Sequence, residues 1–157
     1  MTRTLAWLLV ACGGGSASER QGSGEVSADP AAVADVVGVE VSGADGSYTF
    51  AVSIRSDETG CAQYADWWEV VRADETLAYR RILNHSHPDE QPFTRDGGPV
   101  PVTSGEQLVV RAHHNPTGFT GSIFVGSIES GFVKTGPDPG FAQELASAGP
   151  FPVDCWF

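Results

Sequence analysis

Residues 48–55 alternate strictly between large apolar side chains and small or polar ones. The apolar side chains that would share one face of an extended chain are Tyr48, Phe50, Val52 and Ile54. A repeat of two residues indicates a β-strand with one buried face. Before this segment come a β-branched run over residues 36–41 and Asp45-Gly46, a dipeptide that favours tight hairpin turns. The sequence therefore predicts an antiparallel hairpin over residues 36–55.

Further segments predict short strands of the same kind. They are residues 64–71, 77–83, 107–114 and 119–128, each bounded by turn-forming residues. Residues 84–102 predict a long irregular loop, and Asp138-Pro139 followed by Gly149 predicts a short helix over residues 141–146. We expect an all-β antiparallel sandwich of about seven strands with one short C-terminal helix, similar in architecture to immunoglobulin and fibronectin domains. The spacing of cysteine and tryptophan differs from that of antibody domains, so only the architecture is predicted.

The chain is acidic, with 20 Asp and Glu against 9 Lys and Arg, and a formal charge of −11 over 157 residues. A surface of this charge repels phosphate backbones, which excludes nucleic acid as a partner. It also argues against a polybasic patch that would bind anionic lipids. The length fits one domain better than two.

The N-terminal residues have the order of an export signal. Arg3 precedes an apolar run over residues 5–11 that is too short to span a bilayer as a helix. The run ends in Leu9-Val10-Ala11-Cys12, which resembles the lipobox of bacterial lipoproteins, although its charged and apolar parts are short. The resemblance implies cleavage before Cys12, lipidation of Cys12, for example with palmitate, and attachment to a membrane of the cell envelope, facing the periplasm or the exterior. The alternatives are an ordinary signal peptide and an apolar N-terminus that arises by chance.

The composition changes after Cys12. Residues 12–31 are rich in Gly, Ser and Ala and hold almost no large apolar residue, so they cannot bury enough surface to fold. We therefore expect a signal peptide over residues 1–11, a lipid-anchored flexible linker over 12–31, and a sandwich domain over 32–157.

The chain has three cysteines, and an odd number in an exported protein needs an explanation. If Cys12 carries lipid, Cys61 and Cys155 remain to form a disulfide in an oxidising compartment. Two buried free thiols, or a metal-binding pair, are the alternatives.

All four histidines fall in two groups, His85-Ser86-His87 and His113-His114. His85 and His87 are two residues apart and would point to the same side of an extended chain, as in the beginnings of a Cu²⁺ or Zn²⁺ site. His113 or His114 could complete the site, with Asp89 or Glu90 orienting a ring. Histidines at loop edges that bind no metal are the alternative.

Other residues offer weaker signals. An exposed member of the pair Trp67-Trp68 could stack a sugar, with Tyr64 and Tyr79 nearby, although aromatic residues more often pack in a core. The arginines at positions 80, 81, 95 and 111 are expected to pair with carboxylates at the surface. No Gly-x-Ser-x-Gly motif is present.

These features predict a non-enzymatic, envelope-anchored lipoprotein module. Its expected partners are the membrane, through the lipid anchor, and a metal ion (copper or zinc), a protein or a glycan. The alternatives are a metal-dependent envelope enzyme that uses the histidines and a glycan-binding module that uses an exposed Trp.

Overall fold

The computed structural model describes residues 31–156. The predicted signal peptide, Cys12 and the linker up to residue 30 lie outside the described residues, and so does Phe157.

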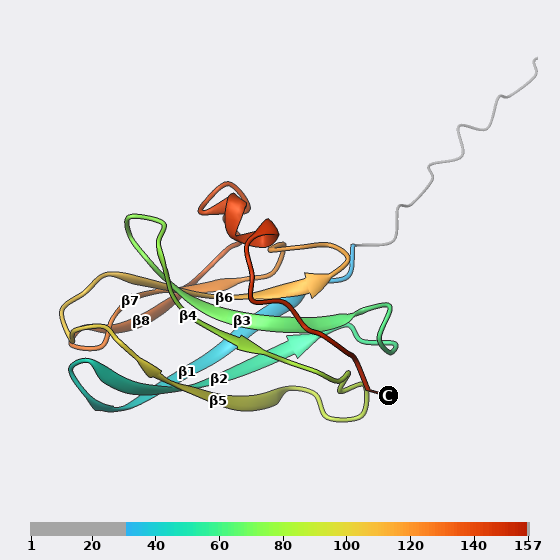
Figure 1. The fold of residues 1–157 in the computed structure, drawn as a ribbon, viewed down its shortest axis with the longest axis horizontal. Helices are drawn as coiled ribbons and strands as arrows, with labels where there is room; N and C mark the ends of the chain where they lie inside the picture. The colour runs from blue at the N-terminus through green and yellow to red at the C-terminus, as the bar shows by residue number, and fades with distance from the viewer. Residues whose placement is uncertain (1–30, 157) are drawn as a thin grey trace, which may run out of the picture.

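Two antiparallel sheets pack face to face (Figure 1). The three-stranded sheet has the order β1-β2-β5, with β1 (Ala34–Ala44), β2 (Ser47–Ser56) and β5 (Phe93–Val100). The five-stranded sheet has the order β4-β3-β6-β7-β8, with β4 (Leu77–Ile82), β3 (Tyr64–Arg72), β6 (Leu108–Asn115), β7 (Ile123–Ser127) and β8 (Gly131–Thr135). The predicted all-β sandwich is confirmed, with eight strands in the described part of the chain.

The core lies between the sheets and follows the alternation that the sequence predicts. In β2 the apolar set of residues 48–54 is buried, whereas Thr49 and Arg55 are exposed. Residues 68 and 70 of β3 and residues 108, 110 and 112 of β6 face them from the other sheet. Burial of one face of each sheet provides the main stabilisation of the fold, because the hydrophobic effect scales with the apolar area removed from water.

Residues 84–102 are not a continuous loop, because β5 occupies residues 93–100 and pairs with β2. The apolar ends of β5, Phe93 and Val100, are buried, but at Gly97 a Cβ atom would lie 2.6 Å from the ring of Tyr79 and 2.7 Å from that of Trp68. Glycine stands where an inward-facing apolar residue would be expected, so the strand lacks the alternating pattern.

Two C-terminal elements also differ from expectation. β8 is an additional edge strand, and its mostly exposed residues carry no core pattern. The predicted helix is a single 3-10 turn, η1 (Gln143–Ser147), whose side chains are not buried. No helix within residues 31–156 is long and apolar enough to cross a membrane.

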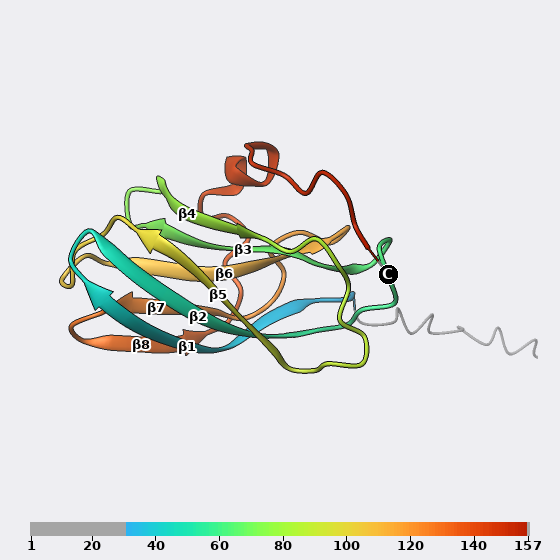
Figure 2. The same cartoon turned by 60° about the horizontal axis from the view of Figure 1, so that its bottom comes forward.

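Both ends of the described chain lie at the same pole of the sandwich, on the right in Figures 1 and 2. Hydrogen bonds and the disulfide link them through the loops of that pole. The Thr117 hydroxyl donates to the carbonyl oxygen of Ala32, the Asn115 amide donates to that of Cys61, and Cys61 is bonded to Cys155. We call this end the terminal pole.

Candidate functional site

The outer face of the five-stranded sheet carries a buried charge triad. Glu69 of β3 is paired in register with Arg80 of β4 on one side and with Arg111 of β6 on the other. Each guanidinium presents its Nε and Nη2 atoms to one oxygen of the Glu69 carboxylate, at 2.6–2.8 Å. The side chains of all three are almost completely buried. Burial lowers the pKa of Arg111, and Glu69 opposes that shift.

Residues 138–156, here called the C-terminal strap, cover this face. The remaining N–H groups of Arg80 donate to the carbonyl oxygens of Leu145, Ala148 and Pro150. Arg111 donates in the same way to Phe141 and Ala142, and its guanidinium lies 3.6 Å from the centre of the Phe119 ring. Two arginines, predicted as surface partners of carboxylates, therefore serve to hold the strap.

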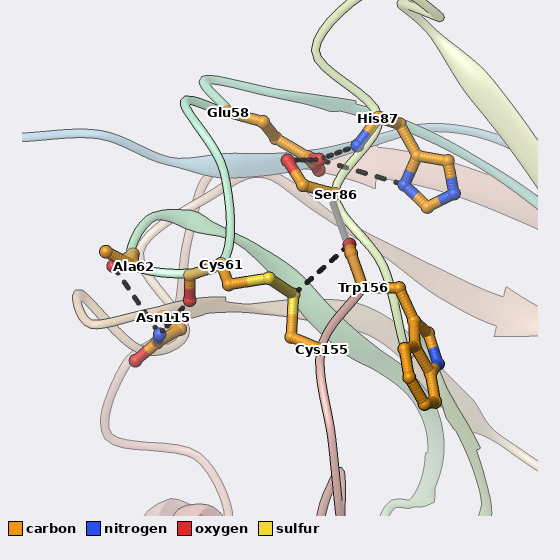
Figure 3. The surroundings of a disulfide bond; sticks show 8 residues. All are labelled: Glu58, Cys61, Ala62, Ser86, His87, Asn115, Cys155 and Trp156. Carbon is orange, nitrogen blue, oxygen red and sulfur yellow. Dashed lines mark hydrogen bonds and ion pairs between the residues drawn. A yellow bond between two sulfur atoms is a disulfide. The ribbon is translucent and has the colours of Figure 1, made fainter.

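The strap ends in the predicted disulfide, which the structure confirms. Cys61 and Cys155 are bonded, with 5.6 Å between their Cα atoms and a separation of 94 positions in sequence. Figure 3 shows this bond beside Asn115 and Trp156, with Glu58 and His87 nearby.

His85 and His87 lie together at the terminal pole, with 4.3 Å between their ring centres. His85 is exposed, whereas His87 is buried and stacked on Phe93 at 4.0 Å. Neither ring nitrogen of His87 has a hydrogen-bond partner among the described residues, and its Nδ1 lies 3.7 Å from a carboxylate oxygen of Glu58. Burial, followed by the charge of Arg95, lowers the pKa of His87.

His113 and His114 point to opposite faces of β6, as their adjacent positions predict, and each is engaged by other groups. His113 stacks on Trp67 at 3.7 Å, and its Nδ1 lies 2.6 Å from a carboxylate oxygen of Asp66. His114 is buried and contacts the Thr117 hydroxyl at 2.9 Å and the carbonyl oxygen of Asp57 at 3.1 Å.

The four histidines therefore do not form one ligand set. Within residues 31–156, no three His, Cys, Asp or Glu side chains are grouped so that they could hold a metal ion. Asp89 is exposed, and Glu90 bonds Arg95 at 2.8 Å. The carboxylate closest to the histidine pair is that of Glu58, which the sequence did not single out. Copper or zinc binding at the histidines stays a prediction.

Neither residue of the pair Trp67-Trp68 is exposed, which agrees with the interpretation that both serve packing and leaves the alternative sugar platform without an exposed ring. Trp68 is fully buried in the core, and Trp67 is 3 % exposed beneath Arg80 and Phe151. The strap covers the face on which Trp67 lies, and no pattern in the sequence predicted this.

A shallow open hollow of about 340 Å³ lies where β4 of one sheet meets β5 of the other. Its lining consists of Thr49, Tyr79, Arg81, Asp96, Gly97 and Gly98. Gly97 has no room for a larger residue, because a Cβ atom there would collide with the Tyr79 and Trp68 rings. No sequence pattern indicates the hollow, because its residues come from three strands.

The polar side chains around this hollow have no partners within residues 31–156. Arg81 and Asp96 are exposed and form no ion pair with any residue of the described part of the chain, and the Thr49 hydroxyl forms no hydrogen bond there. A second hollow of about 150 Å³ shares Thr49 and Asp96 and extends towards Glu40 and Ser42 of β1. A guanidinium, a carboxylate and hydroxyls thus stand beside the edge of the Tyr79 ring, available to a ligand.

Comparison with known proteins reveals a relative from Halomicrobium mukohataei named "Putative lipoprotein". It is 37 % identical to this chain over 135 residues, which cover 80 % of the chain and 64 % of the relative. The chain is similar to a protein named as a lipoprotein. This agrees with the resemblance to lipoproteins that Leu9-Val10-Ala11-Cys12 indicates. The chain spans less than two thirds of the length of this relative. No family model and no solved structure match the chain.

Proposed function

We propose that this protein is a lipid-anchored envelope module that binds a glycan in the hollow between β4 and β5. The proposal has two parts, the anchor and the ligand, which rest on different observations and are tested separately.

The anchor is supported by the pairing of the cysteines. Cys61 and Cys155 are bonded to each other, which leaves Cys12 as the one remaining cysteine of the sequence. Cys12 stands where lipoproteins carry their lipid, and the similar protein from Halomicrobium mukohataei bears a lipoprotein name. Replacing Cys12 by Ser should abolish labelling of the protein by a fatty-acid analogue. A wild-type protein that takes up no lipid would refute the anchor.

The glycan is supported by the chemistry of the hollow, and the single observation that carries it is the set of unpaired groups at Thr49, Arg81 and Asp96. Sugar hydroxyls both donate and accept hydrogen bonds, so a carboxylate, a guanidinium and a hydroxyl side by side can bond vicinal hydroxyls. The Tyr79 ring lines the hollow and offers apolar contact to the C–H groups of a sugar. The hollow is open to water, which favours binding over catalysis.

The test is a screen of the mature chain against an array of neutral and acidic oligosaccharides, followed by calorimetric titration of the sugar that binds best. Arg81→Ala and Asp96→Ala should each weaken binding at least about 10-fold, as expected for loss of a hydrogen bond to a charged group. Arg55→Ala is the matched control, because Arg55 is an exposed arginine of β2 that lines neither hollow. An array on which no sugar is retained, or an Arg81→Ala protein that binds as well as the wild type, would refute the glycan.

A further inference from the structure

The exposed large hydrophobic side chains of the described residues are concentrated in one short segment. Of the four, three lie within residues 151–156: Phe151 is 47 % exposed, Val153 90 % and Trp156 63 %. The fourth, Val133 of β8, is 67 % exposed. We call residues 151–156 the apolar tail. Isolated exposed hydrophobic residues are ordinary, but three in six residues mark a contact surface.

The apolar tail is fixed so that it cannot fold back over its own side chains. Cys155 is bonded to Cys61, and the Trp156 backbone N–H donates to the carbonyl oxygen of Asn84 at 2.8 Å. Trp156 also forms a parallel bridge with His85. Figure 3 shows the Trp156 ring directed away from the two sulfur atoms of the disulfide. Its exposure is therefore built into the fold.

The apolar tail lies at the end of the domain to which the anchored linker is attached. Its end, at Cys155 and Trp156, lies at the terminal pole, where the described chain also begins (Figures 1 and 2). Between Cys12 and Ala31 stand 18 residues, which at full extension reach about 60 Å. This length is the greatest distance that the segment between Cys12 and Ala31 can span. The linker therefore allows the terminal pole to reach the membrane that holds Cys12.

We propose that the apolar tail rests in the interfacial region of the membrane to which Cys12 is attached. This inference rests on the proposed anchor. Trp is the side chain that best fits the boundary between headgroups and acyl chains, because its large ring is apolar and its N–H can bond a polar group. Val153 adds an aliphatic side chain beside it.

The charge of the protein selects the kind of surface. The formal charge is −11, and loss of Arg3 with the signal peptide makes it −12. An anionic bilayer repels such a protein, so the tail fits a zwitterionic or weakly charged interface. The tether makes a weak contact sufficient, because docking within one anchored molecule occurs at a high effective concentration.

Tryptophan fluorescence measures directly whether Trp156 enters the bilayer. Trp67 and Trp68 are buried and Trp7 lies in the predicted signal peptide, so quenching by brominated phosphatidylcholine reports on Trp156. Purified mature protein is incorporated into vesicles of phosphatidylcholine with and without bromine on the acyl chains. The expected result is quenching of part of the emission in the wild type and no quenching in Trp156→Phe, while both proteins sediment with the vesicles.

Two matched variants keep the reporter and test the surface. Val153→Asp should reduce the quenching at least threefold, whereas Val133→Asp, which adds the same charge at another exposed valine, should leave it unchanged. Addition of phosphatidylglycerol to the vesicles should weaken the quenching. Equal quenching in Val153→Asp and the wild type, equal loss in both valine variants, or stronger quenching on anionic vesicles would each overturn the inference.

The same experiment tests separately whether Cys12 anchors the protein and whether the apolar tail contacts the membrane. Wild-type protein that sediments with vesicles but shows no quenching overturns the tail and leaves the anchor intact. Concentration-dependent dimerisation with unquenched Trp156 would assign the tail to a second copy, and also overturns it. Protein that does not sediment refutes the anchor. The unlipidated Cys12→Ser chain, titrated with the brominated vesicles at high lipid concentration, then decides the tail by the presence or absence of quenching.

Discussion

Replacement of Glu69 by Gln tests whether the charge triad holds the outer face of the five-stranded sheet. The carboxylate accepts from the Nε and Nη2 atoms of two guanidinium groups, and the three side chains are out of contact with water. Gln keeps the volume but replaces one oxygen by an NH₂ group. That group would face the N–H donors of one arginine and leave its charge buried and uncompensated.

The expected cost is large for a substitution that changes so little volume. Removal of one partner from a buried ion pair typically destabilises a protein by about 3–5 kcal/mol. For a domain of this size, each kcal/mol lowers the melting temperature by roughly 3 °C, so a decrease of roughly 10 °C is expected. Urea denaturation monitored by circular dichroism, with the disulfide intact, measures the free energy of unfolding.

Glu90→Gln is the matched control. Glu90 also bonds an arginine through two contacts, at 3.1 and 2.8 Å to Arg95, but its side chain is 58 % exposed. An exposed pair contributes at most about 1 kcal/mol. Similar free-energy losses for Glu69→Gln and Glu90→Gln would refute the reasoning that burial makes the triad costly to break.

Three further perturbations have defined outcomes. Burial lowers the pKa of His87 below the ordinary 6.5, so the unfolded chain binds a proton more tightly than the folded chain does. The free energy of unfolding of the wild type should therefore be constant above about pH 6.5 and decrease below it. His87→Phe should reduce that decrease in denaturation curves taken at several pH values, and an unchanged pH profile would contradict the assignment. Joint replacement of Cys61 and Cys155 by Ser should lower the free energy of unfolding by about 4 kcal/mol, because the bond closes a loop of 94 residues, and a loss below about 1 kcal/mol would show that the bond contributes little. Gly97→Ala should cost about 1–3 kcal/mol through collision with the Trp68 ring, and a neutral effect in urea denaturation would show that β5 shifts without strain.

The strands that the sequence predicted most clearly carry a core face of their own apolar residues, whether the opposite face is exposed, as in β2, or covered, as in β3. In β2 every second residue packs into the core, so the pattern is visible without knowledge of the partner strands. β5 was not predicted because Gly97, rather than an apolar residue, occupies an inward-facing position in it. β8 was not predicted because an exposed edge strand needs no apolar face. β5 is defined by its pairing with β2, which is distant in sequence, whereas β8 is defined by a hairpin with the preceding strand β7.

The site residues divide in the same way. The bond between Cys61 and Cys155 could be predicted from the number of cysteines. An exported chain with three cysteines, one of them in the lipobox-like segment, leaves these two to pair with each other. The hollow and the triad could not be found by counting, since each joins residues from three strands. One local signal was present: Glu69 interrupts a run of apolar residues in β3, and a carboxylate in a buried strand requires polar or oppositely charged partners.

The bond between Cys61 and Cys155 divides the chain mechanically. Strands β3 to β8 all lie inside the covalent ring, whereas β1 and β2 lie outside it, between the ring and Cys12. A pulling force between the proposed anchor and a ligand held at Asp96 of β5 would therefore pass through the pairing of β1 with β2 and of β2 with β5. Those hydrogen bonds would yield first, while the residues inside the ring could not be drawn out beyond the bond. The weakest mechanical link of the module is the hairpin that follows the tether.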